Sequence, residues 1–104
     1  MKIAVASEGK EETSNVSAVS GRAPYYLIFE DKKLVKEIKN PFTVGGGAGF
    51  SVAQMLINEE VDMVISGNIG GNMQEMLDSK KVKTKIVEGK TVKEAVEEAE
   101  KSEE

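Results

Sequence analysis

The alternation of short apolar runs with segments of helical periodicity is the feature that most constrains how this chain can fold. Strands are predicted where about four to eight apolar residues are bounded by turn residues, and helices where apolar residues recur roughly every three or four positions. The first three segments are strand-like and the later ones alternate, which gives the order β-β-β-α-β-α-β-α. Strands are predicted over 2–7 (KIAVAS), 25–30 (YYLIFE), 33–39 (KLVKEIK), 61–66 and 81–88, and helices over 49–60, 68–80 and 91–104.

This order predicts a mixed sheet. Strand–helix–strand connections imply parallel pairing with right-handed crossovers, whereas the short turn at Asp31–Lys32 implies an antiparallel hairpin between the second and third strands. A chain of 104 residues has the usual length of one domain. We therefore expect residues 1–104 to form a single α/β domain with a mixed five-stranded sheet.

Helix starts and core faces can also be predicted. Asn68 is a favourable N-cap for the second helix, and Thr91 followed by Glu94 matches the capping-box pattern at the third. In the first helix, helical spacing places Phe50 on the same apolar face as Leu56. Met55, Met63, Met73 and Met76 are interpreted as core residues.

Composition argues against several classes of function. The net charge of −4 and the acidic C-terminal segment leave no basic face of the kind that nucleic-acid binding requires. Histidine and cysteine are absent, which removes the Ser-His-Asp triad, thiol nucleophiles and the commonest soft-metal ligands. Asp31, Asp62 and Asp78 fall at the edges of elements, so clustered carboxylates for a two-metal nuclease are not indicated. We expect a protein that is not an enzyme.

No apolar run approaches the roughly 20 residues that would span a bilayer, and the N-terminus is too short and too quickly charged for a signal peptide. The sequence thus predicts a cytoplasmic protein with no membrane partner.

The loops that follow the strands are predicted to meet at one end of the sheet. If the first strand runs upward, residues 7–24, 40–49 and 66–72 all leave the sheet at the same edge. Ligands in open α/β sheets collect beyond the carboxyl ends of strands. This edge is therefore where we expect a binding site.

The first candidate there is the glycine run that opens the first helix. Phe50 follows Gly49 where a P-loop has lysine, and the third glycine of a dinucleotide fingerprint is replaced by Phe50 or Val52. What remains is an anion cradle made of backbone N–H groups and the positive end of a helix dipole. Alternatively, the glycines only permit a tight turn into the helix. The residues concerned are Gly45, Gly46, Gly47 and Gly49.

A second polar segment and the chain's single arginine are predicted to reach the same edge. Arg22 carries a planar fork of donors that suits a carboxylate, a phosphate or another multiply charged anion, although it could equally pair with a surface glutamate. The polar residues of the second segment could equally serve as caps or turns. The candidates are Ser20, Gly21 and Arg22 in the first loop, and Ser66, Gly67, Asn68, Gly70, Gly71 and Asn72 in the second.

Several stretches, in order, resemble the dinitrogenase iron-molybdenum cofactor biosynthesis family: GRAPYYLIFED (21–31), NP (40–41), VDMVISGNIGGN (61–72) and EGKTVKEAVE (88–97). The resemblance runs from about Met1 to Ala99. It implies a three-layer ribonuclease H-like motif fold with strand order 3-2-1-4-5. It also implies a role in binding or carrying iron-molybdenum cofactor or its iron–sulfur precursor, with cluster-assembly proteins as partners.

One departure from the family pattern affects the expected chemistry. The family usually has His-Phe before Gly-Arg-Ala-Pro, whereas this chain has Val19 and Ser20. Without histidine or cysteine, a cluster would be held as an anion by Arg22 and backbone N–H groups, with a partner chain supplying any ligands. The leading hypothesis is a carrier of an anionic iron-molybdenum or iron–sulfur cofactor precursor. The alternative is a small-anion or nucleotide-phosphate binding module that has lost metal binding.

Overall fold

The computed structural model describes residues 1–43 and 48–102. Its elements follow the predicted order, and the first three strands have the predicted bounds. The strands are β1 (Lys2–Ser7), β2 (Tyr25–Glu30), β3 (Lys33–Lys39), β4 (Met63–Ser66) and β5 (Lys83–Ile86), and the helices are α1 (Ala48–Asn58), α2 (Gly71–Ser79) and α3 (Val92–Ser102).

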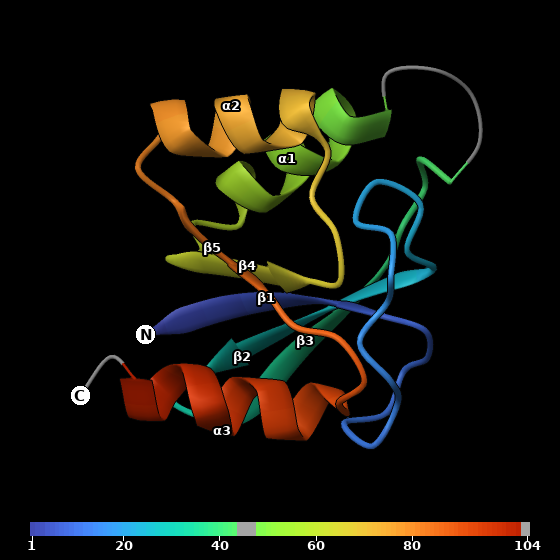
Figure 1. The fold of residues 1–104 in the computed structure, drawn as a ribbon, viewed down its shortest axis with the longest axis vertical. Coiled ribbons are helices and arrows are strands. Elements are labelled where there is room, and N and C mark those ends of the chain that lie inside the picture. Colours follow the sequence, from blue (N-terminus) through green and yellow to red (C-terminus); the bar gives the residue numbers. More distant parts are fainter. Residues whose placement is uncertain (44–47, 103–104) are drawn as a thin grey trace.

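The five strands form one sheet in the order β3-β2-β1-β4-β5. β2 pairs antiparallel with both β1 and β3, whereas β4 pairs parallel with both β1 and β5. Helices α1 and α2 cover one face of the sheet and α3 covers the other (Figure 1). The mixed sheet, its strand order and the three-layer arrangement are thus confirmed.

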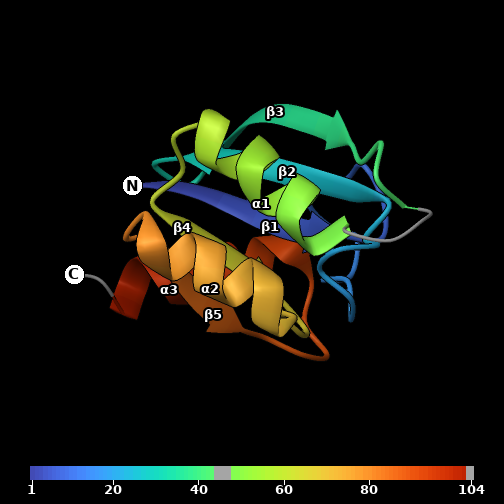
Figure 2. The ribbon, with the colours of Figure 1, turned by 90° about the horizontal axis from the view of Figure 1, so that it is seen from above.

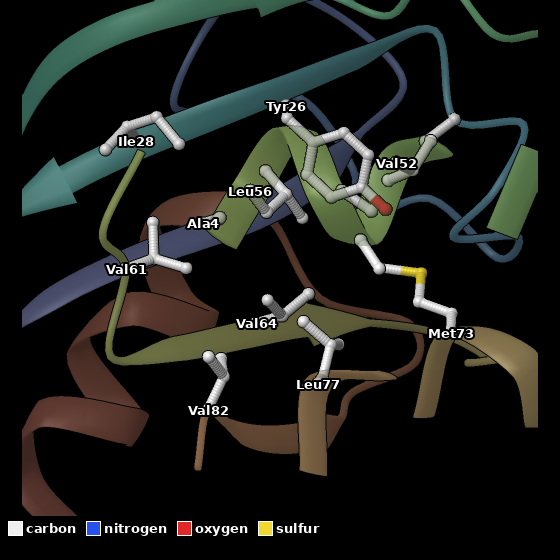
Figure 3. Packing of buried hydrophobic residues seen from close by; sticks show 13 residues of the cluster. Ala4, Tyr26, Ile28, Val52, Leu56, Val61, Val64, Met73, Leu77 and Val82 are labelled. Atoms are coloured by element: carbon white, nitrogen blue, oxygen red, sulfur yellow. The ribbon is translucent and has the colours of Figure 1, made fainter. Parts of the chain in front are cut away.

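Each face of the sheet carries its own hydrophobic core, because alternate residues of β1 point to opposite faces. Ala4 and Ala6 belong to the cluster beneath α1 and α2, while Ile3 and Val5 belong to the cluster against α3. Figure 3 shows the first cluster, in which Tyr26 lies among apolar side chains from both helices and the sheet. Since both faces of β1 are buried, its continuously apolar sequence is explained.

The hairpin turn between β2 and β3 has left-handed backbone at both central residues, with φ of 51° at Asp31 and 71° at Lys32. This is the pattern of a type I′ turn, which matches the twist of the strands it joins. Asp31 accepts a hydrogen bond of 3.0 Å from the amino group of Met1. That contact helps to hold a turn for which glycine and asparagine are the usual residues.

Two details of the predicted packing are wrong. Phe50 is 50% exposed, because α1 directs Val52, Ala53 and Leu56 into the core and Phe50 lies outside that buried face. β5 is shorter than predicted: Val82 and Val87 are buried just beyond its ends, whereas Ile86 is 56% exposed.

Asn68 was predicted to cap α2, and this is also wrong. The helix begins at Gly71 with Gly70 as its N-cap. The Asn68 carbonyl accepts a bond of 3.2 Å from the Ser20 N–H, and the Asn68 N–H donates to Ser66 Oγ at 3.4 Å. These bonds hold Asn68 in the connection that leaves β4, before the helix starts. By contrast, the capping box at Thr91 is confirmed.

Among the described residues, no helix is both long enough and apolar enough to cross a membrane.

Candidate functional site

A hollow of about 320 Å³ lies at the edge of the sheet where the strand-exit loops were predicted to meet. Three segments line it: the loop around Arg22, the start of α1 and the start of α2. In Figure 2 the starts of both helices lie at the same end of the molecule. Of the predicted site residues, the structure brings together Ser20, Gly21, Arg22, Gly49, Asn68, Gly70, Gly71 and Asn72, and it adds Val19, Ala48 and Met73 to the lining.

The three segments approach one another closely at their glycines. A Cβ atom placed on Gly21 would lie 3.6 Å from the Gly49 nitrogen. One placed on Gly49 would lie 3.7 Å from the Met73 nitrogen. The starts of α1 and α2 therefore adjoin, with the Arg22 loop beside them.

Ser66 and Gly67 are buried behind the hollow and are not part of its lining. A Cβ on Gly67 would lie 2.8 Å from the Ala18 Cα, so only glycine allows the 17–20 loop to approach the end of β4 this closely. Ser66 Oγ donates to the Ser17 carbonyl at 3.4 Å. Both residues hold the loop against the sheet.

Gly45, Gly46 and Gly47 of the predicted site lie outside the described residues.

The start of α2 opens into the hollow without a side-chain cap. Its N-cap residue Gly70 has no side chain, and the N–H groups of Gly71, Asn72 and Met73 have no hydrogen-bond partner within residues 1–43 and 48–102. Neither α1 nor α2 has an acidic residue in its first turn. Both helix dipoles therefore present their positive ends to the hollow, and no carboxylate in either described first turn offsets them.

Arg22 is the only charged side chain among the described residues that line the hollow. It is exposed, and its Nη1 donates a hydrogen bond of 3.2 Å to the carbonyl of Thr43. A guanidinium has five N–H donors in a planar fork, a geometry that suits contact with an anion. The cation and the two helix starts give the hollow a positive character.

Sequence reasoning missed two buried polar side chains that hold the Arg22 loop. Tyr26 Oη donates to the Ser20 carbonyl at 2.5 Å. Asn40 Nδ2 donates to the carbonyls of Gly21 at 3.1 Å and Ala23 at 2.9 Å. Burial raises the pKa of the Tyr26 phenol, so the hydroxyl keeps its proton and remains a donor. One sequence signal could have found them: Tyr26 is a polar residue within a largely apolar predicted strand, and Asn40 directly follows the next strand.

The residues present fit an anion held by hydrogen bonds rather than a metal held by coordinate bonds. The chain has no histidine or cysteine, and no group of three or more Asp or Glu side chains within the described residues is placed to hold a metal ion. Met73 is the one lining residue with sulfur, but its side chain is buried and extends into the core near Tyr26 and Val52 (Figure 3).

Comparison with known proteins shows the family and the fold. Residues 1–102 match the family described as dinitrogenase iron-molybdenum cofactor. The apo form of the orange protein from Desulfovibrio gigas is 26% identical with a TM-score of 0.90, and the match covers 97% of this chain and 88% of that one. A putative NifB protein from Thermotoga, of the DUF35 family, is 33% identical with a TM-score of 0.83, covering 96% and 87%. No curated protein sequence matches. The chain therefore belongs to the dinitrogenase iron-molybdenum cofactor family.

Proposed function

We propose that the protein is a non-enzymatic carrier that binds an anionic iron-molybdenum or iron–sulfur cofactor precursor during metal-cluster assembly. The observation that carries the proposal is the convergence of two helix N-termini and Arg22 on one hollow, whose described lining residues include no carboxylate. Membership of the family supports the choice of cargo. The same features disfavour a metal cation, which would be repelled by the guanidinium and by the positive ends of the dipoles.

The size of the hollow favours an anion of many atoms. Its volume of about 320 Å³ lies at the lower end of ligand pockets, which measure roughly 300–1,000 Å³. A water molecule takes up about 30 Å³ in the liquid, so a single small inorganic anion would leave most of the space to solvent. A compact metal–sulfur cluster would use more of the donors that surround it.

Binding of this kind requires no bond to be made or broken. The N–H groups of Gly71, Asn72 and Met73 and the guanidinium of Arg22 would donate hydrogen bonds to the sulfide or oxygen atoms at the periphery of the anion. Because the protein contributes no coordinating atom, the cargo would leave with its own ligands intact. Such release suits transfer to a cluster-assembly protein.

The test is anaerobic mixing of the purified protein with isolated iron-molybdenum cofactor or with its iron–sulfur precursor, followed by gel filtration and metal analysis. We expect iron to elute with the protein, and we expect Arg22→Ala to weaken binding at least about tenfold, since charge-assisted hydrogen bonds contribute roughly 1.5–3 kcal/mol each.

Lys36→Ala is the matched control, because it removes one positive charge from an exposed side chain on β3 that pairs with Glu59 away from the hollow. Absence of iron and molybdenum from the wild-type protein peak would end the proposal. Equal losses of binding in Arg22→Ala and Lys36→Ala would show that only net charge matters.

A second candidate is a small-anion or nucleotide-phosphate binding module that keeps the fold without a metal. The absence of histidine and cysteine favours it, because soft irons are usually held by thiolate or imidazole ligands. Competition distinguishes the two functions. If pyrophosphate or ATP binds to the protein in an Arg22-dependent way while the isolated cofactor does not, the second function is the correct one.

A further inference from the structure

The loop that carries Arg22 is attached to the protein through its carbonyl groups. The carbonyl of Ser20 accepts from Tyr26 Oη at 2.5 Å. Asn40 Nδ2 bridges the carbonyls on either side of Arg22, those of Gly21 and Ala23, at 3.1 and 2.9 Å. The two donor side chains are almost fully buried, at 0% and 4% exposure, and neither lines the hollow.

This attachment fixes the direction of the peptide groups. No peptide bond among the described residues is cis, and in a trans peptide the C=O and the N–H of the next residue point in opposite directions. The Ser20 carbonyl is directed toward Tyr26, so the Gly21 N–H is directed away from it. The Gly21 carbonyl is directed toward Asn40, so the Arg22 N–H is directed away from that side chain.

The Gly21 N–H has no hydrogen-bond partner in the part of the chain that the structure describes. Gly21 and Arg22 both line the hollow. Because the carbonyls of Ser20 and Gly21 are bound to side chains outside the lining, the positive ends of these two peptide dipoles are left on the side of the hollow. A peptide flip would instead present a carbonyl oxygen, which repels an anion.

We propose that Asn40 and Tyr26 are positioning residues for anion binding, which set the polarity of the Arg22 loop so that the hollow is lined by N–H donors. The inference rests on the proposed function for the nature of the ligand. Asn40 Oδ1 also accepts from the Phe42 N–H at 2.9 Å, so both ends of its amide are engaged and its orientation is fixed. The hollow thus has a third set of donors, beside the starts of α1 and α2.

The test compares Asn40→Ala and Tyr26→Phe with Thr91→Ala in binding isolated iron-molybdenum cofactor. We expect binding about tenfold weaker in Asn40→Ala, which frees two carbonyls, and about threefold weaker in Tyr26→Phe, which frees one. Thr91→Ala removes a helix cap that is not part of the lining, and this variant should bind within about twofold of wild type despite its lower stability. Wild-type binding in folded Asn40→Ala and Tyr26→Phe would overturn the inference.

A measurement on the ligand-free protein separates this inference from the proposed function. We expect the amide NMR signals of Gly21 and Arg22 to shift or broaden in Asn40→Ala and in Tyr26→Phe but not in Thr91→Ala. If the wild-type protein binds no cofactor, the proposed function fails, and these signals alone decide the positioning role. Unchanged signals in both variants would overturn it. Tyr26→Phe keeps the ring in the core, so it gives an answer even if Asn40→Ala does not fold.

Discussion

The starts of α2 and α3 are built in opposite ways. At α3, the Thr91 N–H donates to Glu94 Oε1 at 2.9 Å and the Glu94 N–H donates to Thr91 Oγ1 at 3.2 Å. The next two N–H groups, of Val92 and Lys93, donate to backbone carbonyls of the 8–24 loop at 2.9 Å each. At α2, the cap is a glycine and the first N–H groups have no partner within the described residues.

The difference shows that the chain can cap a helix fully and does not do so at α2. A typical N-cap side chain stabilises a helix by about 1 kcal/mol, and α2 lacks that contribution. The donors left at its start are those that an anion would need. We interpret the start of α3 as serving stability and the start of α2 as serving ligand binding.

The largest effect is expected from supplying α2 with the cap it lacks. Gly70 has extended backbone, with φ of −66° and ψ of 157°, and a Cβ on it would meet no atom within 4 Å. Gly70→Asp should therefore be accommodated and should stabilise the fold by a few tenths of a kcal/mol. Its carboxylate would occupy the N–H groups and repel an anion, weakening cofactor binding by about a hundredfold. Thermal unfolding and a binding titration would measure the two effects.

Gly70→Ala is the control for that change, because it adds the same Cβ without the carboxylate. Cofactor binding by Gly70→Ala should stay within a few-fold of wild type. If Gly70→Asp bound the cofactor as well as wild type does, the start of α2 would not be part of the site.

A smaller effect is expected at the other helix start. Thr91→Ala removes the hydroxyl that accepts from the Glu94 N–H and should lower the free energy of unfolding by about 1 kcal/mol. The binding of cofactor should not change, because Thr91 is not among the residues that line the hollow. Chemical denaturation together with metal analysis of the gel-filtered complex would test this. A loss of binding that matched the loss of stability would mean that the two helix starts are not independent.

The smallest effect is a pH dependence confined to α3. Hydrogen bonds from the backbone N–H and the side chain of Thr91 lower the pKa of Glu94 below its usual value of 4.5. A depressed carboxyl pKa stabilises the folded state at pH values above the unfolded-state pKa, and this contribution is lost as the pH falls through the folded-state pKa. The stability advantage of wild type over Glu94→Gln should therefore be present near neutral pH and disappear in acid.

Glu97→Gln changes the same charge on α3 outside the capping box. Unfolding curves at several pH values would compare the two variants. The account of the α3 cap would be contradicted by a Glu94→Gln difference that stayed constant with pH, or by one that Glu97→Gln reproduced.

Much of the fold could be predicted because its signals are local. Runs such as 25–30 and 33–39 have the composition of strands. The capping box requires only Thr91 and Glu94, which are three positions apart in the sequence. Asn68 shows where local signals fail. Its sequence context suits an N-cap, but a backbone bond from Ser20, far away in the chain, holds it in the connection before the helix.

The sequence predicted where the candidate site lies, but not which side chains hold its loops in place. The edge of the sheet followed from the direction of the strands, and most of the predicted loop residues do line one hollow. Asn40 and Tyr26 were missed because their importance lies in contacts with the Arg22 loop, which periodicity and spacing do not report. Ser66 and Gly67 were placed in the site by their position at the end of β4, yet close packing against the 17–20 loop buries them.

The most direct test of the account is an amide NMR titration of the protein with isolated iron-molybdenum cofactor under anaerobic conditions. Unpaired electrons of the cluster broaden the signals of nearby nuclei, so the lost signals mark the site. We predict selective loss of the signals of Gly71, Asn72, Met73 and Gly21, with those of Thr91, Val92 and Lys93 retained. Equal broadening at the starts of α2 and α3, or none at α2, would contradict the division of roles between the two helix starts.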